Sequence, residues 1–156
     1  MLITVAVFVL FVASSAAGLV GRIFPSETNI KTAGGNPGDR DPTLDLLARL
    51  AQAEVKDGSY PCKLAVAAVV VNRTEDPAFP NTIAAVIYQP QAFGSVTDGR
   101  IMGYASMKAY RAAEEAYAGL DPTYGSLYFW NPYEAVSPHV WQRDIVTQIG
   151  RFVFAR

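Results

Sequence analysis

Apolar positions recur at helical spacing in the stretch that begins near residue 42. They fall three or four residues apart, which places them on one face of a predicted helix: Leu44, Leu47, Ala48, Ala51 and Val55. Asp41 can cap this helix, and Pro42 suits its first turn, where a missing N–H does no harm. Glu54 comes three residues after Ala51, so it lies at the border of the apolar face, near the predicted helix end.

A second predicted helix is apolar on nearly every side. Tyr60 and Pro61 begin it, and Ser59 can cap it. The run CKLAVAAVVVNR follows, with Lys63 as the exception to its apolar character. Residues 69–71 are valines, which favour a strand, but the alanine-rich context and the length of the run favour a helix. A helix of this composition is expected to be buried on most sides.

Two further helices are predicted downstream. Residues 82–89 form the first, with Asn81 as its cap, Pro90 as its stop, and a core-facing side made of Ile83, Val86 and Ile87. A glycine-punctuated loop over residues 91–103 separates it from a helix over residues 105–118, which ends at Gly119. The larger side chains of this last helix are expected to face inward, with Glu114 and Glu115 toward water: Met107, Tyr110, Ala113 and Tyr117.

Alternating side chains predict two short strands near the C-terminus. Leu127 and Phe129 alternate with Tyr128 and Trp130, and residues 149–154 form a second strand that could pair with this one. The intervening segment is predicted to be an excursion that carries Trp141. The chain is therefore expected to be α+β and mainly α, with a small antiparallel β element.

The N-terminal part has a different character. Residues 2–21 carry no charged side chain, and twenty helical residues reach about 30 Å, the thickness of a bilayer core. We expect residues 1–24 to be a signal peptide, with cleavage after Ala17, or an uncleaved membrane anchor. Residues 25–42 are rich in Gly, Pro, Asn and Asp and predict a flexible linker. Residues 43–156 then form the main predicted domain, which either a signal peptide or an anchor would send across a membrane.

The composition of the chain limits the classes of partner that it is expected to bind. The formal net charge is −1, which gives no electrostatic case for nucleic acid or for an anionic membrane surface. Aromatic residues make up 12% of the chain, and a neutral, aromatic-rich domain suits a sugar polymer better than a phosphate polymer. The chain has one cysteine and one histidine, so no metal-ligand spacing and no intramolecular disulfide are expected, and we predict no cofactor.

Glu54 is the first candidate for chemistry. A carboxyl group at an apolar border favours its protonated form, which a general acid needs near neutral pH. Taken from spacing alone, the favoured interpretation is that Glu54 simply extends into water beside the polar loop, because perturbed carboxyl groups are the minority.

A family resemblance strengthens the catalytic interpretation. Six blocks occur in order: ARLAQAEVKDG, KLAVAAVVVNR, FPNTIAAVIYQPQAF, TDGRI, LYFWNP and IGRFVFAR. Together they resemble, in order and spacing, the catalytic domain of spore-cortex-lytic enzymes and related bacterial cell-wall hydrolases. The resemblance covers about residues 44–156. It implies a lysozyme-like lytic transglycosylase fold, and its catalytic glutamate matches Glu54. Cys62 and Phe152 depart from the family pattern, which commonly has glycine and histidine there, so no role of that histidine transfers to this chain.

The resemblance also implies a cleft lined by the loop after the third helix. Its candidate substrate contacts are Gln89, Phe93, Ser95 and Asp98. Aromatic rings stack on sugar faces and amides bond hydroxyl and N-acetyl groups, which adds four candidates from the strand region: Tyr128, Trp130, Asn131 and Trp141. A simpler interpretation is that Phe93 and the two tryptophans belong to the core and that Asp98 belongs to a turn.

Several mechanisms stay open at the level of sequence. A lytic transglycosylase needs one glutamate, whereas a hydrolytic glycosidase usually needs two carboxylates. Asp57, Asp98 and Glu134 are the candidates for a second carboxylate, and Asp98 is the best placed of them. A module that binds peptidoglycan without cutting it stays open too, as does an amidase or peptidase built on Cys62 and His139. Transglycosylation between N-acetylmuramic acid and N-acetylglucosamine is the favoured prediction, in vegetative wall or spore cortex.

Overall fold

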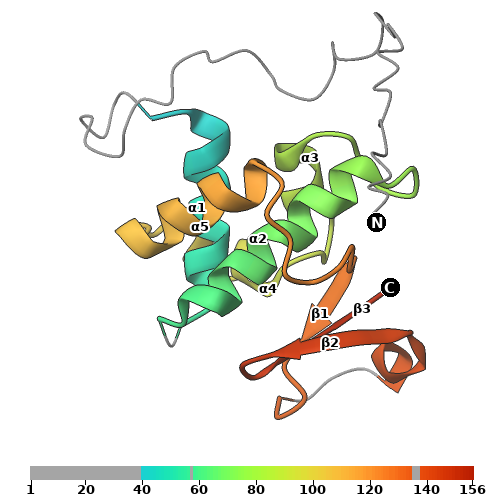
Figure 1. Ribbon diagram of the computed structural model, residues 1–156. Coiled ribbons are helices and arrows are strands. Elements are labelled where there is room, and N and C mark those ends of the chain that lie inside the picture. The colour runs from blue at the N-terminus through green and yellow to red at the C-terminus, as the bar shows by residue number, and fades with distance from the viewer. Residues whose placement is uncertain (1–39, 57, 135–137) are drawn as a thin grey trace, which may run out of the picture. The chain divides into compact units, whose positions relative to one another are not determined.

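The computed structural model describes residues 40–56, 58–134 and 138–156. The predicted N-terminal signal or anchor, most of the predicted linker, and Asp57 lie outside these ranges. Within them, no helix is both long and apolar enough to span a membrane. The described part is mainly helical and ends in a small antiparallel sheet (Figure 1), as the sequence predicts.

The first two helices follow the sequence closely. Helix α1 is Pro42–Glu54, and the Asp41 carboxylate accepts hydrogen bonds from the backbone N–H groups of Thr43 and Leu44. Helix α2 is Tyr60–Glu75 and is buried over most of its length. The three valines at residues 69–71 are therefore helical, as predicted. Ser59 is the N-terminal capping residue of α2, although its side chain makes no capping hydrogen bond.

The connection between α2 and the next long helix contains more structure than the sequence suggests. Helix α3 is Ile83–Ile87, with Ile83, Val86 and Ile87 buried as expected. Its cap is Thr82, whose hydroxyl accepts from the Ala85 N–H, so the prediction of Asn81 is wrong. The expected loop contains the short helix α4, Gly94–Thr97, and the 3-10 helix η2, Arg100–Met102.

Helix α5, Met107–Tyr117, buries a face that overlaps only partly with the predicted one. Tyr110 and Ala113 are buried, but Met107 and Tyr117 are more than half exposed. The inner face is a stripe of small residues: Ala109, Ala112, Ala113 and Ala116. Because α5 packs against both α1 and α2, a side of small residues allows close approach, and the larger side chains stay at the periphery. Gly119 follows with a φ of +97°, which suits the stop predicted there.

The sheet has three strands in the order β1-β3-β2, both pairs antiparallel. Strand β1 is Tyr128–Trp130, β2 is Ile145–Ile149 and β3 is Phe152–Ala155. The predicted pairing of the first and last strands is confirmed, with Phe129 opposite Phe154. Strand β2 was not predicted, because its side chains are mostly half-buried or exposed and give a weak alternation.

The sheet packs on α2 through a small apolar cluster. Side chains from both sides of this contact are buried together: Val55, Cys62, Ala65, Val66, Val69, Phe152 and Phe154. Next to it, the end of α2 is hydrogen-bonded to the chain that leads into β1. The Asn72 amide donates to the Asp121 carboxylate at 3.0 Å and to the Ser126 carbonyl at 3.1 Å, and Arg73 Nε donates to the Leu127 carbonyl at 2.7 Å. The helices thereby fix the position of β1.

Candidate functional site

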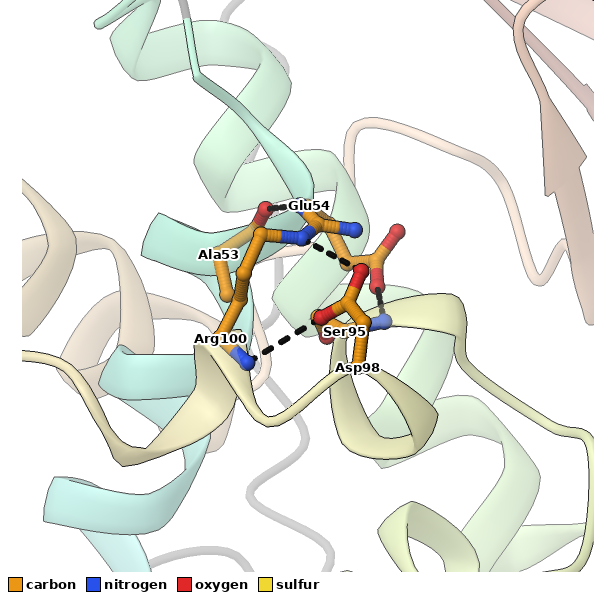
Figure 2. Close-up of polar contacts among 5 residues, drawn as sticks. All are labelled: Ala53, Glu54, Ser95, Asp98 and Arg100. Atoms are coloured by element: carbon orange, nitrogen blue, oxygen red, sulfur yellow. Dashed lines mark hydrogen bonds and ion pairs between the residues drawn. The ribbon is translucent and has the colours of Figure 1, made fainter.

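Glu54 is the last residue of α1 and is half-buried. Its Oε1 accepts a hydrogen bond of 3.2 Å from the backbone N–H of Ser95, at the start of α4. Figure 2 shows the other carboxylate oxygen directed away from this contact. One oxygen is therefore held by the protein while the other remains available to a ligand.

Two cationic side chains hold the end of α1 in place around Glu54. Arg100 Nη1 donates to the carbonyl of Ala53 (Figure 2), and Lys63 Nζ donates to the carbonyl of Val55 at 2.6 Å. The C-terminal end of a helix carries unpaired carbonyl groups and a partial negative charge, so both contacts are favourable there. Lys63 is fully buried, and the Val55 carbonyl gives its charge a partner among the apolar residues of the first half of α2.

The Asp98 carboxylate is engaged by a neighbour. Its Oδ2 lies 2.7 Å from Arg100 Nε, and its Oδ1 accepts from the Arg100 backbone N–H at 3.1 Å (Figure 2). These hydrogen bonds, the side-chain one first, hold the pKa of Asp98 below its ordinary value. Asp98 is exposed and does not line the groove described below, so its evident task is to orient Arg100, which in turn supports the end of α1.

A groove of about 540 Å³ opens in front of Glu54. Helix ends, α4 and the sheet all contribute to it. Its charged and polar lining consists of Glu54, Lys56, Arg73, Arg100, Asn131, Glu134 and Arg151. Its aromatic lining consists of Phe93, Phe129, Trp130 and Phe152. Such a mixture of ring faces and hydrogen-bonding groups suits a sugar polymer better than an apolar ligand.

A second hollow of about 350 Å³ adjoins the groove. The two share four lining residues, Arg73, Ala92, Phe129 and Trp130. The second hollow extends along the sheet side past Tyr128 and Arg143, and across to Gln89. The site is therefore an elongated surface with the Glu54 carboxylate in one of its two parts.

The predicted contact residues are distributed over both parts. Phe93, Trp130 and Asn131 line the groove with Glu54, while Gln89 and Tyr128 line the second hollow. Phe93 and Trp130 are also largely buried, so each belongs to the core and to the groove wall.

Ser95 and Trp141 take other positions. Ser95 is fully buried, so its side chain cannot be a substrate contact as predicted, and its backbone N–H serves Glu54 instead. Trp141 lines neither part and packs edge-on against Trp130, with ring centroids 5.5 Å apart.

Several lining residues were not found by sequence reasoning. Arg73 is the most informative, because its guanidinium lies over the rings of Phe79, Phe93 and Tyr128 at 5.1–5.6 Å. Burial lowers the pKa of Arg73 from its ordinary value. The only signal in the sequence was an arginine at the end of an apolar helix, which more often marks a solvated helix terminus.

The candidates for other chemistries are placed as follows. Glu134 lines the groove and accepts from the Asn131 amide at 2.9 Å. Cys62 is buried under the sheet, where its thiol donates to the Ile149 carbonyl at 3.4 Å, whereas His139 is exposed on the 3-10 helix η3, Pro138–Gln142. A buried thiol is inaccessible to a polymer. Among the residues that the structure describes, no cluster of three or more His, Cys, Asp or Glu could hold a metal ion.

The fold and the site define a mainly helical α+β domain with the Glu54 carboxylate in an elongated groove lined by aromatic and charged side chains. A family model for Cell Wall Hydrolase matches residues 57–155. This chain belongs to that cell wall hydrolase family. Glu54 itself lies just before the matched range.

Known proteins agree with this assignment. The chain is 37% identical over 129 residues to a spore cortex-lytic enzyme of Halalkalibacterium halodurans, a match that covers 82% of this chain and 39% of the relative. It is 39% identical over 111 residues to a spore cortex-lytic enzyme of Bacillus subtilis, covering 71% and 36%. The chain thus spans well under half the length of these relatives.

Solved structures confirm the predicted fold and resemblance. The catalytic domain of the germination-specific lytic transglycosylase SleB from Bacillus anthracis matches with a TM-score of 0.70 at 34% identity, covering 78% of this chain and 100% of that one. The catalytic domain of the Bacillus cereus SleB protein matches with a TM-score of 0.68 at 35% identity, covering 79% and 99%.

Proposed function

We propose that this chain cleaves the glycan strands of peptidoglycan and that Glu54 is its general acid. The observation that carries the proposal is the Glu54 carboxylate at the groove, with one oxygen held by the Ser95 N–H and the other unengaged in Figure 2. The family, and relatives described as spore cortex-lytic enzymes and a lytic transglycosylase, support this substrate class.

The proposed reaction is lytic transglycosylation. Protonated Glu54 gives its proton to the oxygen between N-acetylmuramic acid and N-acetylglucosamine, and the bond from that oxygen to muramic C1 breaks. The resulting Glu54 carboxylate then takes the proton from the muramic 6-hydroxyl, whose oxygen closes on C1. The products are a 1,6-anhydro-muramic end and a free N-acetylglucosamine 4-hydroxyl, and Glu54 is again protonated.

The Ser95 contact suits a group that alternates between acid and base. A hydrogen bond from a backbone N–H to a carboxyl oxygen stabilises the carboxylate that exists between the two proton transfers. The cationic contacts on the Ala53 and Val55 carbonyls keep the helix end, and so the acid, in one position during both transfers.

Hydrolysis is the second candidate, and one observation favours it. Glu134 lines the same groove as Glu54 and could activate water, whereas Asp98 is bound to Arg100 outside the groove. The hydrolytic alternative therefore depends on Glu134 rather than on Asp98. A substrate in the cell wall or cortex is reached only after export, for which residues 1–24 remain the predicted signal or anchor.

The test is digestion of purified peptidoglycan followed by mass spectrometry of the fragments. We expect 1,6-anhydro-muramic ends. Reducing muramic ends would indicate hydrolysis, and loss of these ends in Glu134→Gln would assign the second carboxylate. Free stem peptides would indicate an amidase or peptidase, and intact polymer would indicate a binding module. The last two results contradict the proposal.

A further inference from the structure

The second hollow differs from the Glu54 groove in its charge. Among its lining residues, two are cationic, Arg73 and Arg143, and none carries a carboxylate. The groove, by contrast, holds both Glu54 and Glu134. A chain with a net charge of −1 has no general excess of positive charge, so this concentration is a local property of the second hollow.

The two arginines lie on the same aromatic ring. The Arg143 guanidinium is 3.3 Å from the centroid of the Tyr128 ring, and that of Arg73 is 5.6 Å from it. The two guanidinium groups are close enough to repel each other. Burial is the main reason why the pKa of Arg73 is lowered, and the positive charge of Arg143 lowers it further. Neither takes part in the ion pairs formed between described residues, which are Asp45–Arg49, Asp98–Arg100 and Arg111–Glu115.

An anion would remove this repulsion. Arg73 uses its Nε for the Leu127 carbonyl, which fixes the plane of its guanidinium. Stacking on Tyr128 likewise orients Arg143. A guanidinium group binds a carboxylate through two parallel N–H donors, and two oriented guanidinium groups on one ring bring such donors to the same hollow.

The position of the second hollow connects it to the cleavage site. It shares Arg73, Ala92, Phe129 and Trp130 with the groove, so a strand that passes Glu54 continues into it. We propose that the second hollow binds a carboxylate carried by the glycan strand, at a position adjacent to the sugar pair that Glu54 cleaves. This inference rests on the proposed function and narrows its substrate to strands with an ionised substituent there.

Two sources can supply the carboxylate. A muramic acid without its stem peptide carries a free lactyl carboxylate, and a muramic acid with its peptide carries carboxylates on the peptide. Both present the same chemistry to the arginines. A muramic unit whose carboxyl group forms an internal amide has neither a lactyl carboxylate nor a peptide carboxylate. We expect such a unit to bind more weakly in this hollow.

The experiment uses the full chain and three forms of one peptidoglycan preparation: intact, stripped of stem peptides by an amidase, and intact with its carboxylates converted to neutral amides by carbodiimide coupling to methylamine. The variant is Arg143→Gln, because Arg73 also supports β1. Lys108→Gln is the control, since it removes one positive charge from an exposed position on α5 that lines neither part of the site. Initial cleavage rates give KM and kcat.

On the carboxylate-bearing substrates, we expect Arg143→Gln to raise KM about tenfold with kcat little changed, as for loss of one charge-assisted contact. Amidation should raise KM of the wild type by a similar factor and leave Arg143→Gln unaffected. Lys108→Gln should follow the wild type throughout. A KM effect on stripped but not intact strands would identify the lactyl carboxylate, and the reverse would identify the peptide.

The inference is overturned if Arg143→Gln changes KM equally on charged and amidated strands, or not at all. A wild type that cleaves none of the three substrates would instead overturn the proposed function, and this inference with it. The two failures are therefore distinguishable.

Discussion

The two walls of the groove are built in different ways. Glu54 comes from the helical region, where α1, α2 and α5 meet through closely packed alanines such as Ala51, Ala112 and Ala116, all essentially unexposed. The opposite wall comes from a small sheet of short strands (Figure 1), whose edge strand β2 has half-buried and exposed residues. Close packing allows little movement, so the helical region holds the proposed acid in place, whereas the sheet contributes side chains that line the groove.

This contrast separates two kinds of effect. Changes at the end of α1 should alter kcat, because they affect Glu54, the group that we propose transfers protons. Changes in the sheet wall should alter stability or KM while leaving the chemistry intact. The following substitutions test this division.

The largest effect is expected from Glu54→Gln. The amide cannot transfer the proton, so we expect kcat to fall about 10³-fold. The fold should be intact, because the amide oxygen can still accept from the Ser95 N–H. Glu114→Gln, at a half-buried glutamate on α5 that lines neither part of the site, is the matched control and should retain full activity. Rates of fragment release together with urea unfolding measure both properties.

A smaller effect, on stability, is expected where the sheet packs on α2. Gly150 has a φ of +58°, and a Cβ there would lie 2.6 Å from Cys62 Sγ. Gly150→Ala should lower the free energy of unfolding by about 2 kcal/mol through backbone strain and overlap with the thiol. Cys62→Ala in the same chain should recover about 1 kcal/mol, because it removes the overlap but not the strain.

Gly119→Ala is the control for the strain alone. Its φ is +97°, but no neighbouring atom lies within 4 Å of the added Cβ. It should be destabilised by less than Gly150→Ala and should show no coupling to Cys62→Ala in urea unfolding. Equal losses at both glycines would show that the Cys62 contact carries no energy.

The junction of the two regions should be sensitive to pH. Burial raises the pKa of Asp121, but hydrogen bonds from Thr123, Gly125 and Asn72 outweigh it and hold that pKa below its ordinary value. A depressed carboxylate pKa stabilises the fold above the ordinary value near 3.8, and this contribution is lost as the pH falls through the folded-state pKa.

Asp121→Asn should therefore lower the free energy of unfolding by about 1 kcal/mol at pH 7, after allowance for its partial exposure. The difference in the free energy of unfolding between this variant and the wild type should become smaller below pH 4. Urea unfolding at both pH values measures it, and Asp144→Asn, at an exposed site, is the control. If this difference in the free energy of unfolding becomes larger in acid, the ionised Asp121 carboxylate does not stabilise the connection between α2 and β1.

The smallest effect is expected from Trp141→Ala. Trp141 lies outside both parts of the site, and its ring packs at 78° to the ring of Trp130, which lines both. An aromatic pair contributes about 0.5–1.5 kcal/mol, so KM should rise about threefold with kcat unchanged. Tyr104→Ala, a fully exposed aromatic, should have no effect. A tenfold or greater rise in KM would place Trp141 against the sugar, as the sequence suggested.

Sequence reasoning reached Glu54 in two steps: its place at the border of an apolar helix face made it a candidate, and the six blocks that resemble the family made it the favoured one. It did not reach the Ser95 N–H, because a backbone donor has no signature of its own. It chose Met107 and Tyr117 over the equally periodic alanines of α5, since hydrophobic size suggests burial, whereas close helix packing requires small residues. Arg73 and Arg143 were missed because they come from distant segments that meet only in the folded chain.

The most direct test of the central claim is a crystal structure of the Glu54→Gln variant with a peptidoglycan tetrasaccharide bound. The account predicts that the oxygen between muramic acid and glucosamine lies within about 3 Å of the residue-54 side chain, with the strand continuing past Trp130 toward Arg143. A strand bound elsewhere on the molecule, with the side chain of residue 54 out of reach of any glycosidic oxygen, would contradict it.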